Sequence, residues 1–215
     1  MDVKRVRLGF DLRIPPETQK ENPSQWDQCL LPELCSPISV DPAVWLTTEE
    51  VDAFVQDSSW KRVGMELPHL CNPLGLATDF DWFLEVLRKR GISIAGLCPV
   101  CLTIYETNLI WWRKHCGPGY FERQPTEEEL LSQGWRFRGF DVMDGRGLIS
   151  GLKGCGYKEP IWSELRHYFG GALNEAGLFS DNAIASRFAE VRGIEIRDHA
   201  PFVVVGMLTQ DVLGG

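Results

Sequence analysis

Two cysteines separated by two residues are the pair of side chains whose types and spacing best fit a chemical site. They are Cys98 and Cys101, in the segment Cys98-Pro99-Val100-Cys101, which follows a predicted strand. If a helix began at this segment, its N-terminus would lower a thiol pKa and favour thiol–disulfide exchange. The same pair could instead supply two thiolate ligands to a tetrahedral zinc ion. A third interpretation is structural, because reduced cysteine packs as a small apolar residue.

A zinc site would need two more ligands beyond this pair. The nearest candidates are His115 and Cys116, with Cys71 and His69 farther away, and the sequence has no second closely spaced cysteine pair. The motif itself resembles the glutaredoxin dithiol, Cys-Pro-x-Cys, which implies redox catalysis. A glutaredoxin also needs a proline at the start of a nearby strand. Here that proline could only be Pro201, much farther along the chain.

Polar pairs elsewhere could serve as acid, base or cation ligand. Asp198-His199 could act as an oriented general base, and Asp141 with Asp144 could bind a cation. Each is an isolated pair, for which a structural role is the alternative. The sequence contains no Gly-x-Ser-x-Gly elbow, no phosphate-binding glycine loop and no His-Glu-x-x-His motif. We therefore expect no catalytic residues and no cofactor.

The charge balance bears on the kind of partner. Thirty acidic and 22 basic residues give a net charge of −8, which opposes binding to a nucleic-acid backbone. An acidic surface suits a basic protein, although the same charge also keeps an ordinary protein in solution. Charges interrupt the first seven residues, and the longest apolar run, 201–208, is too short to span a bilayer. We expect a cytoplasmic protein with reduced cysteines and no membrane segment.

Hydrophobic periodicity predicts strands and helices that interleave without regular alternation. Residues 6–14 alternate between apolar and other side chains, as in a strand with one buried face, and a Pro-rich irregular segment follows over 15–46. The segment 135–157 predicts a central hairpin, with a bulge at Gly139. Further elements are expected as helices beginning near 47, 78, 126, 160 and 181, and strands over 92–97, within 101–112, and over 201–208.

Caps and apolar faces of these helices can also be predicted. Thr126 and Glu129 form a capping-box pattern, Asp181 can cap the last helix, and Gly193 would end it. The residues expected on buried helix faces are Trp82, Phe83, Val86 and Leu87, then Trp162, Leu165, Phe169 and Leu173, and then Ile184, Phe188 and Val191.

Two short repeats suggest an internal duplication, for which chance is the alternative. Leu8-Gly9-Phe10-Asp11-Leu12 is similar to Arg138-Gly139-Phe140-Asp141-Val142, and 89–94 is similar to 191–196. The predicted fold class is α+β, a mixed and largely antiparallel sheet with helices packed against it. We expect residues 1–215 to form a single globular domain.

Three C-terminal patterns carry a resemblance to a functional class. The segments 139–142, 150–152 together with 155–157, and 198–202 resemble patterns in bacterial immunity proteins, which are encoded beside secreted polymorphic toxins. This resemblance implies an inhibitor that binds its cognate toxin domain and has no activity of its own. Its binding surface would then consist of surface acids and exposed aromatic residues, for which the candidates are Asp141, Asp144, Glu127, Glu128 and Trp112.

Two other classes stay open at this point. One is a small cytosolic enzyme or zinc-binding protein that uses Cys98 and Cys101, and the other is an interaction domain outside toxin biology. Metal content distinguishes the zinc protein from the inhibitor.

Overall fold

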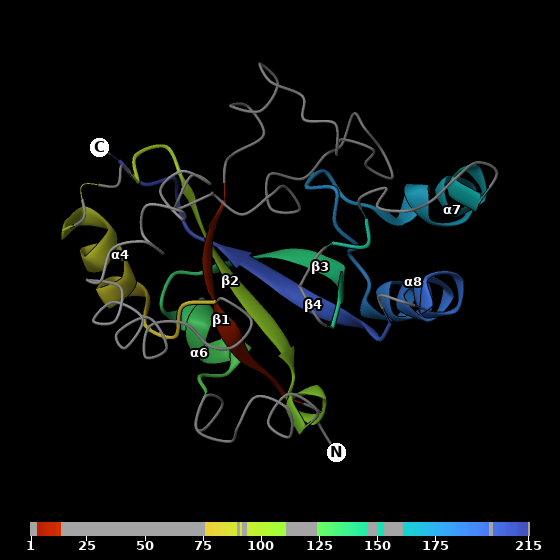
Figure 1. The fold of residues 1–215 in the computed structure, drawn as a ribbon, viewed down its shortest axis with the longest axis horizontal. Coiled ribbons are helices and arrows are strands. Elements are labelled where there is room, and N and C mark those ends of the chain that lie inside the picture. The colour runs from red at the N-terminus through yellow and green to blue at the C-terminus, as the bar shows by residue number, and fades with distance from the viewer. Residues whose placement is uncertain are drawn as a thin grey trace, which may run out of the picture.

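A four-stranded antiparallel sheet forms the centre of the molecule. The computed structural model describes residues 4–13, 76–89, 91, 94–110, 124–145, 150–152, 161–197 and 200–214. The strands are β1 (Arg5–Arg13), β2 (Cys98–Tyr105), β3 (Arg136–Asp144) and β4 (Phe202–Thr209). Their order is β1-β2-β4-β3, and each neighbouring pair is antiparallel (Figure 1). The predicted α+β class is confirmed.

Helices gather at the two ends of this sheet. Near β1 lie α4 (Phe80–Lys89) and α6 (Glu127–Ser132), whereas α7 (Ile161–Phe169), the 3-10 turn η3 (Gly170–Ala172) and α8 (Asn182–Glu195) lie at the other end (Figure 1). The predicted helix starts are confirmed where the caps form. Thr126 accepts a hydrogen bond from the Glu129 amide in a capping box, and Asp181 accepts from the amides of Ala183 and Ile184.

The predicted bulge at Gly139 is confirmed, and β1 contains a second one. The register of β3 against β4 shifts between Phe137 and Gly139, where φ is 141°. A Cβ at Gly139 would lie 2.8 Å from the Leu178 Cβ, so only glycine fits this close approach. In β1 the register shifts between Arg7 and Gly9. Because of this shift, apolar and other side chains do not alternate uniformly between the two faces of β1, as the sequence predicted over 6–14.

The sheet consists of two halves with one arrangement. In each half an outer strand with a bulge pairs with an inner strand, and Gly9 faces Leu102 as Gly139 faces Met207. Leu102 and Met207 also face each other where β2 meets β4. An approximate two-fold axis therefore passes between Leu102 and Met207 and relates β1-β2 to β3-β4.

The helix that precedes each inner strand follows the same symmetry. A bridge joins Phe10 of β1 to Ala77, and an equivalent bridge joins Phe140 of β3 to Phe179. Two residues after each bridge, an aspartate caps a helix by accepting hydrogen bonds from its amides at Oδ1. This aspartate is Asp79 before α4 and Asp181 before α8. The repeats that the sequence suggested therefore correspond to equivalent places in the structure.

Several predicted boundaries are wrong. β3 pairs with the long apolar strand β4, and the described part of its own continuation, 150–152, adds an antiparallel bridge from Ser150 to Met143. A strand is predicted over 92–97, whereas the described residues 94–97 form a turn before β2. α8 continues through Gly193 to Glu195, since an open surface there tolerates glycine within a helix. On α4 the buried stripe contains Leu84, whereas Trp82 is 36% exposed.

Two hydrophobic clusters hold the layers together. One joins α4 and α6 to the β1 side, through Phe10, Phe83, Leu87, Leu130 and Trp135. The larger cluster joins α7 and α8 to the sheet through residues that include Phe169, Phe179 and Phe188. The predicted helix near 47 and the Pro-rich segment lie outside the described residues. No helix in the described ranges has the length and apolar character needed to cross a membrane.

Candidate functional site

The strand geometry of β2 separates Cys98 from Cys101. Residues three apart on a regular strand point to opposite faces of the sheet, so the two thiols cannot share one zinc ion. No helix begins at the motif, and burial raises the pKa of the Cys101 thiol. The geometry of β2 therefore does not support the dithiol and zinc interpretations of this pair. His115 and Cys116 lie outside the described residues, within which no three potential metal ligands cluster.

Asp141 and Asp144 are buried and do not belong to an exposed acidic surface. Their residue exposures are 0% and 3%, and as residues three apart on β3 they face opposite sides of the sheet. They therefore do not form one cation site. The Oδ1 atom of Asp141 accepts hydrogen bonds from the Val142 amide at 2.7 Å and from the Ser150 hydroxyl at 2.8 Å. The sequence could not show this burial, because it depends on what covers β3.

The two glutamates at the start of α6 have different environments. Glu127 is half-buried, and its Oε2 accepts from the Arg5 Nε at 2.9 Å and from the Thr103 hydroxyl at 2.5 Å. Glu128 is exposed. Only Glu128 of the five predicted binding residues is thus placed on an open surface, since Trp112 lies outside the described residues. Asp198-His199 also lies outside them.

Arg5 crosses the face of the sheet from β1 to β3. Its Nη2 donates to the Thr103 carbonyl at 3.0 Å, and its guanidinium lies 4.7 Å from the centre of the Phe140 ring. Gly206 is the β4 residue beneath this path, because it faces Thr103 on one side and Phe140 on the other. The side chain of Arg5 is 8% exposed, so this network connects strands and is not available to a partner.

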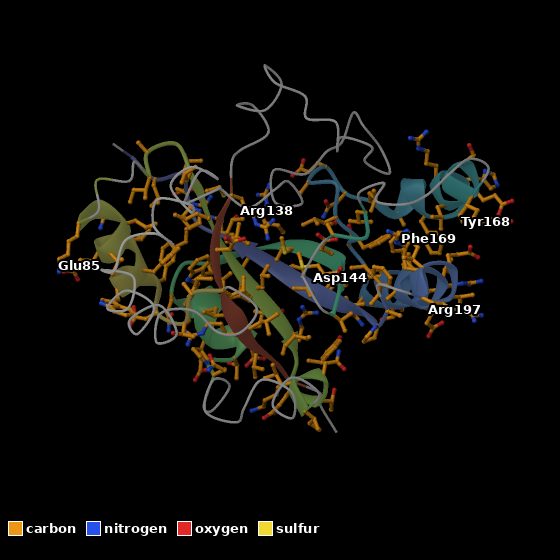
Figure 2. The ribbon with its side chains drawn as sticks, viewed as in Figure 1. Glu85, Arg138, Asp144, Tyr168, Phe169 and Arg197 are labelled. Atoms are coloured by element: carbon orange, nitrogen blue, oxygen red, sulfur yellow. The ribbon has the colours of Figure 1, made fainter. Side chains whose placement is uncertain are left out.

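An open groove between α7 and α8 is the described surface best suited to a partner. Its volume is about 640 Å³. Tyr168, which is 75% exposed, and Ile184, which is 37% exposed, lie along it. Figure 2 shows Tyr168 and Phe169 at the end of the molecule that α7 and α8 form. The remaining lining residues are Ile161, Glu164, Leu165, Phe169, Ala172, Ala183, Arg187, Val191 and Glu195.

Sequence reasoning missed this groove, although a signal was present. The predicted buried stripe of the helix near 160 contained Leu165 and Phe169, and both are buried. Tyr168 lies beside that stripe on the helix, so its large aromatic ring is expected at the surface and not in the core. On α8 the prediction placed Ile184 on the buried face together with Phe188. Phe188 is buried, whereas Ile184 is exposed at the groove.

A second cavity lies on the other side of α8. Its volume is about 630 Å³. The described residues around it come from the end of β2 and the residues after it, from α8, from Gly145 after β3, and from the segment that leads from Ala200 into β4. Groove and cavity thus flank the face of α8 that packs on the sheet. Comparisons of the chain with protein-family models, with curated proteins and with solved structures found no match.

Proposed function

We propose that this protein is an immunity-type inhibitor that binds a cognate toxin domain through the groove between α7 and α8. The observation that carries the proposal is the exposure of Tyr168 and Ile184 along an open groove. Exposed apolar patches with a polar rim are typical of protein–protein interfaces, in which tyrosine often contributes much of the binding energy. The resemblance to immunity proteins adds the class of partner.

Charge supports a basic partner. The chain carries a net charge of −8, and Glu164 and Glu195 line the groove with one arginine, Arg187. A basic toxin would be attracted over distance by the net charge and aligned by the two glutamates. Glu128 on α6 is exposed and contributes to the same long-range attraction. The inhibitor would work in the cytoplasm, where it would block the toxin without catalysis.

The geometry of two residue pairs favours the inhibitor over the enzyme alternative. Cys98 and Cys101 face opposite sides of a strand, and the carboxylates of Asp141 and Asp144 are buried on opposite sides of another. Neither pair is thus placed to act together as ligands or as acid and base.

Capture and growth rescue test the proposal together. The tagged chain is expressed in its native host, and proteins that it retains at moderate salt are identified by mass spectrometry. A protein encoded in a neighbouring reading frame is then expressed with and without the chain. We expect stoichiometric capture and restored growth. If no neighbour is captured, or if growth is not restored, the proposal is wrong.

Matched variants then locate the surface. Tyr168→Ala and Ile184→Ala should each weaken binding of the captured protein about tenfold or more, because interface anchors typically contribute over 1 kcal/mol. Trp82→Ala is the control, since Trp82 is exposed to the same extent as Ile184 but lies on α4, at the other end of the sheet. Equal losses for all three variants, or none for the groove variants, would assign the binding surface elsewhere.

A further inference from the structure

The cavity beside α8 combines an apolar wall with polar groups. Pro201, Phe202 and Val203 supply apolar surface from the start of β4. Hydroxyl, amide and carboxylate groups come from the other side, with Tyr105, Thr107, Asn108, Ser186 and Glu190. A volume of about 630 Å³ lies within the range of small-molecule sites in proteins. The cavity is therefore large enough for a small organic ligand.

The approximate two-fold symmetry shows that this cavity belongs to one half only. The caps at Asp79 and Asp181 align α4 with α8, so Leu84 corresponds to Ser186 and Leu87 corresponds to Ala189. In the first half both leucines are buried in the hydrophobic cluster around Phe10. In the second half the small residues Ser186 and Ala189 line the cavity.

α8 packs on the sheet through Ala185, Phe188 and Ala189. It has no large apolar residue at the two positions where α4 buries leucine. The space beside these positions is an open, partly polar cavity, which favours a site for a ligand.

The Glu190 carboxylate indicates which charge a ligand of this cavity would carry. It is exposed, lines the cavity, and makes no ion pair within the described residues. Two buried arginines lie behind the aromatic walls, Arg5 against Tyr105 and Arg192 against Phe202. The first is ion-paired with Glu127. Neither arginine is among the described residues that line the cavity, and no lysine is among them. Within the described lining Glu190 is thus the charged residue, and it makes the cavity favour a cation.

We propose that this cavity binds a small organic monocation, an ammonium or guanidinium group on a short apolar stem. The cation lies against the Glu190 carboxylate, and the stem lies along Pro201 and Phe202. The hydroxyl groups of Thr107 and Ser186 are close enough to the cavity to accept hydrogen bonds from the cation. Such a group is found both in free amines and in the lysine or arginine side chains of a bound protein.

The test uses probes that differ only in charge. The isotope-labelled full chain is titrated with n-butylguanidinium, n-butylammonium and the neutral n-butylurea, and amide shifts of Ser186, Ala189 and Gly193 are followed by NMR. We expect millimolar binding of both cations at these amides and much weaker binding of the urea. No shift with either cation, or equal shifts with butylurea, overturns the proposal.

Variants separate the cavity from the rest of the acidic surface. Glu190→Gln should weaken cation binding about fivefold, the upper range for an exposed ion pair. Glu195→Gln is the matched control, because it removes an exposed glutamate of the same helix on the groove side. Ala189→Leu restores the residue of the equivalent position in α4 and should abolish binding. If Glu190→Gln binds as tightly as Glu195→Gln does, the cation is not held here.

Native mass spectrometry of the chain purified from its host distinguishes the two sources of the cation, a free amine and a basic side chain of a bound protein. An added mass that disappears on denaturation, and that Ala189→Leu lacks, identifies a free amine. If the purified chain carries no added mass and Glu190→Gln weakens its capture of a protein, the cation is a basic side chain of that protein. This inference does not rest on the inhibitor proposal, because the probes are titrated without a toxin.

Discussion

Gly206, in the middle of β4, lies where the Arg5 guanidinium crosses the sheet. A Cβ at this position would overlap the Arg5 Nη2 and would lie 2.8 Å from the Arg5 Cζ and 2.5 Å from the Thr103 Oγ1. Gly206→Ala must therefore displace the Arg5 side chain. The displacement breaks its ion pair with Glu127 and its contact with the Phe140 ring. We expect this single methyl group to destabilise the whole sheet.

The magnitude follows from what Arg5 loses. The side chains of Arg5 and Glu127 are 8% and 20% exposed, and breaking a buried ion pair costs about 3–5 kcal/mol. The Thr103 hydroxyl, which donates to Glu127, is also too close to the new Cβ and must move, so the whole range applies. Alanine recovers about 0.5–1 kcal/mol relative to glycine in a strand. The free energy of unfolding should fall by about 2–4 kcal/mol, which lowers the Tm by about 4–16 °C in a chain of this size.

Urea unfolding followed by tryptophan fluorescence measures this change. Gly171→Ala is the control, because a Cβ there would meet no atom within 4 Å. A double-mutant cycle adds Arg5→Ala, which removes the group that the new methyl displaces. The double variant should therefore lose less stability than the sum of the two single variants. A Gly206→Ala loss below about 0.5 kcal/mol, or strict additivity with Arg5→Ala, would refute this reasoning.

Three further predictions concern other parts of the described fold. Cys101 should react with iodoacetamide slowly in the folded chain and rapidly in urea, because burial raises the pKa of its thiol; equal rates would contradict its placement in β2. Burial also raises the pKa of Asp11 despite the Arg13 ion pair, so its contribution to stability is present below the unfolded pKa and is lost as pH rises through the folded pKa. Urea titrations across that pH range should show a smaller loss for Asp11→Asn than for the unmodified chain. Asp181→Ala should cost about 1 kcal/mol, measured by the Tm, because two amides of α8 lose their cap; an unchanged Tm would show that this cap is not needed.

Local signals in the sequence predicted local structure well. The capping box at Thr126, the cap at Asp181 and the bulge at Gly139 each depend on a few neighbouring residues, and all three form as expected. The α+β class followed from the same signals, because interleaved strands and helices together with a bulged strand favour antiparallel pairing.

Predictions that depended on tertiary neighbours were less successful. Cys98 and Cys101 looked like one site only because their spacing was read without the period of a strand. Asp141 looked like a surface residue because its cover, which includes Ser150, comes from a different segment. The pairing of β3 with β4 was not predicted, since sheet order is fixed by long-range packing that no local pattern records.

The two halves of the sheet give an internal reference for where function lies. Where α4 buries Leu84 and Leu87 in the core, α8 carries Ser186 and Ala189 beside a cavity. The other side of α8 borders a groove with an exposed tyrosine. Because both halves keep the same register and the same helix cap, these differences are not required to build the sheet. The second half therefore carries the surfaces on which binding should be sought first, and substitutions on α4 serve as controls for those on α8.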